Sequence, residues 1–216
     1  MNLFDPNPRS ALEYLPPHHD LKSLKHAAEQ CRGCDLYQQA TQVVFGEGRV
    51  HSPLFLVGEQ PGDREDQKGR PFVGPAGLLL DKCLESAGID RQDVYVTNAV
   101  KHFKWEPRGK VRLHKKPSSL EIAACRPWLE SEIEAVQPQI IVCLGATAAQ
   151  DLLGSQFRLT RHRGEVFSTP YGPVTATIHP SAILRMPEPD AKEAETASLI
   201  SDLKAAAVYV AARRGK

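Results

Sequence analysis

Short apolar runs, broken by glycine, proline and polar residues, form the main pattern of this chain. Four runs have the composition of buried strands: 54–57, 93–100, 139–145 and 174–178. Apolar residues at helical spacing predict helices that begin near Asp20, Pro75, Ser118 and Ala146, and a tail helix over 191–210. Strands that alternate with helices are typical of an α/β domain with a mostly parallel sheet.

Other segments depart from this pattern. Residues 1–19 are rich in proline and polar groups and predict an N-terminal arm, followed by a single domain over 20–213. Residues 63–74 and 101–116 show neither a helix nor a strand period, so we expect both to be loops. A further short strand is expected within 157–167.

Polar side chains stand where the predicted strands end. Gly58-Glu59-Gln60-Pro61-Gly62 follows the first strand, and its glycines and proline fix a rigid turn. Asn98 ends the second strand, and His179 ends the last. The carboxyl ends of parallel strands form the edge where α/β sheets bind ligands. A surface turn with a solvated carboxylate would explain Glu59 alone, but three polar strand ends at one edge favour a site.

The net charge of the 216 residues is only +1, so a nucleic-acid site must come from local clustering of charge. Residues 101–116 contain seven Lys or Arg, with Phe103 and Trp105 between them. Such a run is usually a solvated loop. Aromatic rings among basic residues also suit backbone phosphates and an unstacked base, which favours a DNA contact.

Cysteine usage points to metal rather than to disulfides. No apolar run approaches the roughly 20 residues of a membrane helix, and the first residues lack a signal-peptide pattern, so we expect a cytoplasmic protein. Five cysteines in such a chain favour metal or cluster ligation. Cys31 and Cys34, spaced C-x-x-C, are the first candidates. Cys83 and Cys143 lie in apolar patterns and are expected in the core, with Cys143 as a reserve ligand.

Four short motifs, in order along the chain, resemble those of a known family: Gly58–Gly62, Pro71–Gly74, Thr97-Asn98 and His179–Ser181. The family is the uracil-DNA glycosylase superfamily, in particular its iron–sulfur members related to family 4. The Arg112-Leu113-His114 segment resembles the UdgX class, although Val111 stands where that class has arginine. The resemblance implies a three-layer α/β/α sandwich around a four-stranded, mostly parallel sheet.

The family resemblance implies removal of uracil from DNA, and the UdgX class implies that the protein stays attached to the sugar C1′ through a loop histidine. The implied catalytic residues are His114, Glu59 and His179. The implied substrate-binding residues are Gly58, Gln60, Asp63, Phe72 and Asn98. The implied DNA contacts are Lys110, Arg112, Ser181 and Arg185, the last as a plug for the space that the base leaves.

The chemistry requires these residue types, because the base must leave the duplex before its glycosidic bond can be reached. Phe72 would stack on uracil, and Asn98 would pair with its O4 and N3–H, which selects against cytosine. Cleavage gives a cationic sugar and a uracil anion, which Glu59 and His179 would stabilise. His114, as a neutral imidazole, would then attack C1′ in place of water. The alternative for His114 is a solvated loop histidine.

The resemblance also implies a 4Fe-4S cluster held by Cys31, Cys34, His102 and Cys125, with histidine in place of one cysteine. A structural zinc would suit the same four ligands. The expected partner is uracil-containing DNA, single-stranded or double-stranded, with uracil as product, no membrane and a monomeric protein. Two alternatives stay open: a turnover glycosylase whose loop histidine only contacts phosphate, and a non-catalytic module that binds uracil-containing DNA.

Overall fold

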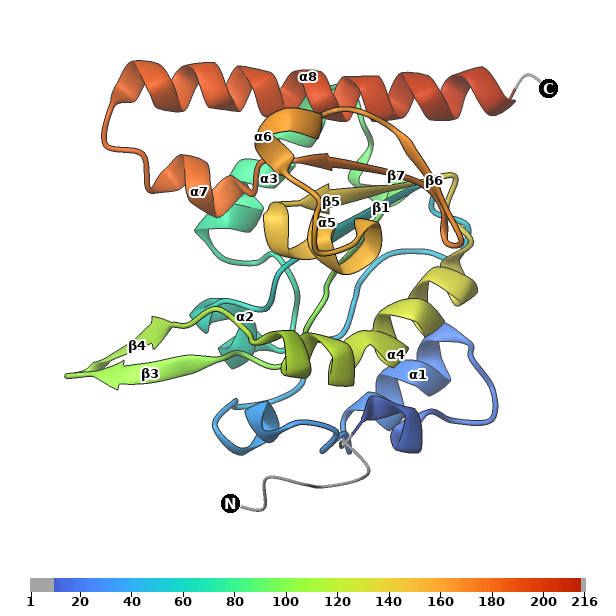
Figure 1. Ribbon diagram of the computed structural model, residues 1–216, viewed down its shortest axis with the longest axis vertical. Coiled ribbons are helices and arrows are strands. Elements are labelled where there is room, and N and C mark those ends of the chain that lie inside the picture. The colour runs from blue at the N-terminus through green and yellow to red at the C-terminus, as the bar shows by residue number, and fades with distance from the viewer. Residues whose placement is uncertain (1–9, 215–216) are drawn as a thin grey trace.

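A five-stranded sheet runs through the middle of the computed structural model, which describes residues 10–214 (Figure 1). The strand order is β2-β1-β5-β7-β6, formed by Val94–Asn98, Leu54–Gly58, Ile140–Leu144, Gly172–Thr177 and Phe167–Thr169. The first four strands are parallel, and β6 pairs antiparallel with β7 at the edge. The predicted four-stranded parallel sheet is therefore confirmed, with one antiparallel strand added.

Helices cover both faces of this sheet, which gives the three layers of the prediction (Figure 1). One face packs against α3 (Pro75–Ser86), α7 (Pro180–Leu184) and α8 (Pro189–Arg214). The other face packs against α4 (Ser119–Val136) and α5 (Ala146–Leu153), and α1 (Leu21–Ala28) packs on α4.

The alternation of side chains along β1 explains the two cores. Leu54 and Leu56 join the apolar cluster under α3 and α8, whereas Phe55 and Val57 join the cluster under α4 and α5. A strand that is buried on both faces reads as a continuous apolar run, which is the pattern that predicted it.

Two helix starts are confirmed in detail. The Asp20 carboxylate accepts the N–H groups of Lys22 and Ser23 at the start of α1. Ser118 and Glu121 form the predicted capping box of α4. The short helix predicted from Ala146 matches α5, and the tail helix extends beyond its predicted bounds to Pro189–Arg214.

The predictions that residues 63–74 and 101–116 are loops are wrong. Both segments contain regular secondary structure, although their apolar residues do not recur at helix or strand spacing. Residues 63–74 contain α2 (Asp63–Lys68), which buries the carboxylates of Glu65 and Asp66 instead of an apolar face. Residues 101–116 contain an antiparallel hairpin of β3 (Trp105–Arg108) and β4 (Val111–His114). The strand expected within 157–167 begins only at its last residue, because α6 (Leu159–His162) occupies part of that segment.

Residues 10–19 pack onto the domain. Ala11, in the 3₁₀ helix η1 (Ala11–Tyr14), is fully buried in a third apolar cluster with Leu24 and Trp128. Two further 3₁₀ helices are η2 (Asp35–Gln38) and η3 (Arg91–Asp93). The predicted arm begins in residues 1–9, which lie outside the described residues, and its boundary at residue 20 stays a prediction. Within residues 10–214, no helix is long and apolar enough to cross a membrane.

Candidate active site

Gly58, the last residue of β1, marks the centre of the site. A Cβ placed on it would lie 2.4 Å from Asn98 Oδ1, 2.9 Å from Phe72 Cζ and 3.3 Å from His179 Nε2. Asn98 stands beside Gly58 because the two residues are register partners in the parallel pair β1–β2. Three sequence-predicted residues thus meet at one point at the carboxyl edge of the sheet, and only glycine leaves that point open.

The backbone of Phe72 is tightly constrained. Its φ of +54° lies in the left-handed region, which a bulky residue rarely adopts. Helix α3 presses against it, since a Cβ on Gly77 would come within 1.7 Å of the Phe72 carbonyl oxygen. On the other side, Glu65 accepts the Gly74 N–H at 2.7 Å. The Phe72 ring centre lies 6.1 Å from that of His179 at 25°, so a strained backbone presents a fixed aromatic face to the site.

His179 presents one defined nitrogen to the site. Its Nδ1 accepts the Ser181 N–H at 3.0 Å, so the proton of the neutral ring lies on Nε2, the atom near Gly58. Burial, helped by the charges of Arg185 and His114, lowers the pKa of His179 to about 4. The imidazole is therefore neutral at physiological pH and can donate Nε2–H.

Glu59 and His114 approach each other from β1 and from the hairpin. His114 Nε2 lies 3.7 Å from Glu59 Oε1, and the other carboxylate oxygen, Oε2, accepts the Thr147 hydroxyl at 2.5 Å. Burial lowers the pKa of His114; Glu59 opposes this shift and Arg185 adds to it. The neutral imidazole, which is the nucleophilic form, therefore predominates at physiological pH.

Arg112 anchors the hairpin to the domain. Its guanidinium donates to Asp63 Oδ1 at 2.5 Å and to Asp66 Oδ2 at 2.6 Å. It also lies 5.5 Å from the ring centres of both Phe103 and Trp105. Asp66 is completely buried, so this pair holds β4 against α2 from inside the protein.

Gln60 closes the base of the same hairpin. Its amide nitrogen donates to the carbonyl oxygens of Lys104 and Lys115, at 3.2 and 2.9 Å, and its Oε1 accepts the Lys104 N–H at 3.0 Å. These two residues flank the hairpin. Arg112 and His114 are two positions apart on β4, so their side chains lie on the same face of the strand. His114 therefore stands on a hairpin fixed both at its base and along its length.

This anchor changes the interpretation of three predicted residues. The side chains of Gln60, Asp63 and Arg112, which we predicted to touch substrate or DNA, bond to the hairpin and to α2 in this structure, and their contact with substrate or DNA stays a prediction. Sequence reasoning missed this because the partners lie far apart along the chain. The three residues hold the hairpin that carries His114.

Comparison with known families shows the family to which the chain belongs. The family model described as "Uracil DNA glycosylase superfamily" matches residues 45–204, which include the strand ends and the hairpin. This chain belongs to the uracil-DNA glycosylase superfamily. Assignment to the narrower UdgX class depends on the hairpin residues Arg112, Leu113 and His114 and is not settled by this match.

Several relatives of this superfamily member are named uracil-DNA glycosylases. A protein of Thermotoga maritima named type-4 uracil-DNA glycosylase is 39% identical over 167 residues, covering 76% of this chain and 83% of that protein. A type-4 uracil-DNA glycosylase of Archaeoglobus fulgidus is 39% identical over 166 residues, covering 73% and 80%. A type-5 uracil-DNA glycosylase of Pyrobaculum aerophilum is 29% identical over 154 residues, covering 63% and 64%.

The other predicted DNA contacts of this superfamily member lie near the surface. Lys110 is exposed in the hairpin turn beside Gly109. Arg185 follows α7, is exposed, and its charge acts on the pKa of His179. Ser181 donates its backbone N–H to the same histidine. Contact of these residues with DNA stays a prediction.

Three of the four predicted cluster ligands gather in the third apolar cluster. Cys31 Sγ accepts the Trp128 indole N–H at 3.2 Å, and Cys125 Sγ accepts the Lys101 N–H at 3.3 Å. Burial raises the pKa of Cys34 to about 11, with Cys31 adding to the shift, and burial also raises the pKa of Cys125, to which both other thiols add. Three neighbouring thiols with N–H groups directed at two sulfurs fit a cluster-binding set.

His102 fits this set less directly. Burial lowers its pKa to about 4, and the charge that opposes the shift is Asp66, not a thiol. Within residues 10–214, no group of three or more His, Cys, Asp or Glu is arranged to hold a metal ion. Cys31, Cys34 and Cys125 nevertheless lie together in or beside the third apolar cluster, and whether they hold a 4Fe-4S cluster or zinc is a matter for metal analysis.

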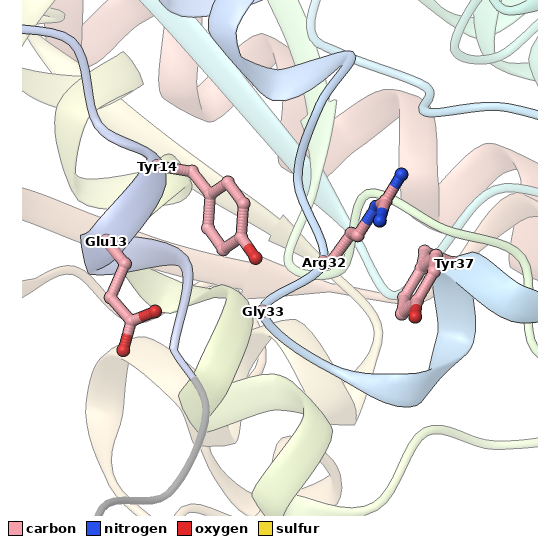
Figure 2. A pocket seen from close by; sticks show the side chains of 5 residues that line it. All are labelled: Glu13, Tyr14, Arg32, Gly33 and Tyr37. Carbon is pink, nitrogen blue, oxygen red and sulfur yellow. The ribbon is translucent and has the colours of Figure 1, made fainter.

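A separate cavity of about 280 Å³ opens beside the loop between Cys31 and Cys34. Figure 2 shows its lining: Glu13, Tyr14, Arg32, Gly33 and Tyr37. None of the residues around Gly58 takes part in it. This cavity is therefore separate from the strand-end site.

Two contributors to the site carried no signal in the sequence. Thr147 lies at an ordinary helix start, and only the structure shows its hydroxyl on Glu59. Lys101 counts toward the basic run, but it is fully buried and pairs with Glu132 of α4. A basic residue next to a strand end gives no local sign of such a partner.

Proposed function

We propose that this protein removes uracil from DNA and then stays bonded to the sugar through His114. The observation that carries the proposal is the 3.7 Å separation of His114 Nε2 and Glu59 Oε1, on a hairpin anchored at two places. Superfamily membership and the names of the type-4 relatives support excision. The UdgX-like Arg112-Leu113-His114 segment supports trapping.

Uracil occupies the space over Gly58. Phe72 stacks on the base, and the Asn98 amide donates to O4 and accepts from N3–H. Cytosine presents an amino donor at C4 and an acceptor at N3, which reverses both bonds. A buried polar group without a partner costs about 1–3 kcal/mol, so the reversed pattern excludes cytosine.

Cleavage moves the electron pair of the C1′–N1 bond onto the departing base. Neutral His179 donates Nε2–H to uracil O2, where negative charge develops. Glu59, oriented by Thr147, places its carboxylate beside the cationic sugar. Both charges of the transition state then face groups that are already in position.

His114 takes the place of the attacking water. Its Nε2 lone pair forms the bond to C1′, and the resulting imidazolium releases its Nδ1 proton to water, while the uracil anion takes a proton from water. Glu59 stabilises the imidazolium while it forms. A fixed nucleophile outcompetes water through its effective concentration. Val111 replaces the arginine of the UdgX class, and Arg112 supplies the anchor.

A cluster is part of the same proposal. Cys31, Cys34 and Cys125 would hold it, with His102 as the predicted fourth ligand. When bound, a 4Fe-4S cluster supplies metal–sulfur bonds that link the segment between α1 and η2 to α4. Visible absorbance and iron content of the purified protein test this part independently of activity.

The experiment that tests the function uses a labelled oligonucleotide with one uracil, single-stranded in one arm and double-stranded in the other. Wild-type protein should release uracil and give a protein–DNA band that survives boiling in detergent. His114→Ser should lose the band. Uracil release with free abasic DNA and no band would establish the turnover alternative. Binding without any release of uracil would establish the non-catalytic module.

A further inference from the structure

We infer that Lys101 is a positioning residue for Asn98, and so determines how the site recognises uracil. The inference rests on the proposed function. Lys101 touches neither the base nor the sugar in this account. It acts by holding the end of strand β2, where Asn98 stands.

The Lys101 ammonium is fully engaged inside the protein. Its side chain is 1% exposed and that of Glu132 is 0% exposed. Nζ has three N–H donors, and three acceptors surround it: Thr97 Oγ1 at 2.7 Å, the Asn98 carbonyl oxygen at 2.7 Å and Glu132 Oε2 at 2.5 Å. Each donor therefore has one partner, and one of the three is the Asn98 backbone.

The Asn98 carbonyl depends on this bond. On the side facing β1, the end of β2 is held by the residue after Asn98: the Ala99 N–H donates to the Gly58 carbonyl oxygen at 2.9 Å. Asn98 is only 3% exposed, so its carbonyl needs a partner inside the protein. The Lys101 ammonium supplies a charge-assisted bond, which is stronger than a neutral one. Without it, the peptide that carries the uracil-reading side chain loses its support on one side.

The position of the ammonium is itself fixed from several directions. Glu132 Oε1 accepts the Gly46 N–H at 2.9 Å and the Tyr95 hydroxyl at 3.0 Å, and Oε2 lies 2.9 Å from the Thr97 hydroxyl. The backbone of Lys101 is held separately, by its N–H bond to Cys125 Sγ at 3.3 Å. The network thus connects α4 to the strand end that bears Asn98.

Stability alone does not account for this pair. Replacing a buried ion pair with uncharged residues of similar volume is often neutral or stabilising, whereas removing one partner alone is strongly destabilising. A neutral double replacement can therefore preserve the fold while it removes the ammonium–carbonyl bond, together with the ammonium's bonds to Thr97 and Glu132. That difference separates a positioning role from a structural one.

The test compares Lys101→Met/Glu132→Gln with wild type and with Tyr95→Phe. Tyr95→Phe removes a different bond to Glu132 and leaves the Asn98 contact intact. Excision is measured in single turnover with enzyme in excess, which gives a maximal rate and a half-saturating enzyme concentration. Affinity for free uracil, followed by NMR titration, gives a readout that needs no catalysis. Thermal unfolding checks the fold of each protein.

We expect the folded double variant to lose about 10- to 100-fold in maximal excision rate, as a misplaced catalytic constellation does. Its uracil affinity should fall about tenfold, while half-saturation by DNA changes less than about threefold because the outer DNA contacts remain. Tyr95→Phe should match wild type in all three. A folded double variant with wild-type excision and uracil affinity would overturn the role of Lys101.

A different result would overturn the proposed function. It fails if wild-type protein releases no uracil, and the uracil titration then still decides the role of Lys101. A wild-type protein that does not bind uracil would overturn this inference as well. Equal losses in the double variant and in Tyr95→Phe would show a general effect of the network and would also overturn it.

Discussion

Replacing Arg112 with alanine should separate trapping from excision. Arg112 fixes the strand that carries His114, but it makes no contact with Asn98, Phe72 or His179. The variant should therefore still remove uracil. Its hairpin, held only at its base by Gln60, should present the nucleophile less often.

The structure sets the size of this effect. The bond from Arg112 to the buried Asp66 is charge-assisted and contributes about 1.5–3 kcal/mol. The carboxylate of Asp63 is 45% exposed, so solvent screening limits that pair to about 0.2–1 kcal/mol. Together these contributions give a loss of about 1.7–4 kcal/mol from the anchored state, which corresponds to roughly 15- to 700-fold slower trapping at about 1.4 kcal/mol per tenfold.

The assay follows uracil release and the detergent-resistant band in the same single-turnover reaction. Arg108→Ala is the matched control, since it removes the same charge from an exposed position on the same hairpin, outside the anchor. We expect the ratio of band to released uracil to fall in Arg112→Ala and to stay at the wild-type value in Arg108→Ala. Equal loss of trapping and excision in Arg112→Ala would show that Arg112 does not act by anchoring the hairpin that carries His114.

Three further predictions follow from contacts of single residues. Burial lowers the pKa of His114, so its neutral form accumulates as the pH rises through a value below 6.5. The single-turnover rate of trapping should therefore rise with pH up to that value and then level off. A trapping rate that still increases above pH 7 would contradict this prediction. Thr147→Val should slow excision about tenfold by removing the hydroxyl from Glu59, while Thr147→Ser should keep the rate; equal rates would exclude the contact. Ser118→Ala should lower the free energy of unfolding in denaturant by about 1 kcal/mol by opening the capping box, without changing excision; an unchanged midpoint would contradict it.

The parts of the fold that sequence reasoning captured are those with a local cause. Apolar runs gave the parallel strands, and Ser118 with Glu121 marked a helix start. Asn98 and His179 were placed at one edge because parallel strands end together. Their meeting at Gly58 follows from that rule and from the register of β1 with β2.

The parts that sequence reasoning missed depend on contacts between distant residues. Arg112 belongs by composition to a basic run that we predicted to contact DNA, and only the fold brings Asp66 to it. Helix α2 has no apolar period because it buries carboxylates, and these bond to Arg112 and to the Gly74 backbone. Lys101 and Glu132 are 31 positions apart, and no local pattern marks them as a pair.

The proposed function depends on a covalent bond between one imidazole and the sugar, and peptide mass spectrometry can locate that bond. Wild-type protein is incubated with uracil-containing single-stranded DNA, digested with protease and nuclease, and searched for a peptide that carries a deoxyribose-derived remnant. If the proposal is correct, the modified peptide contains the β4 segment and fragmentation places the remnant on His114. Released uracil with no modified peptide, or a remnant on any other residue, would contradict it.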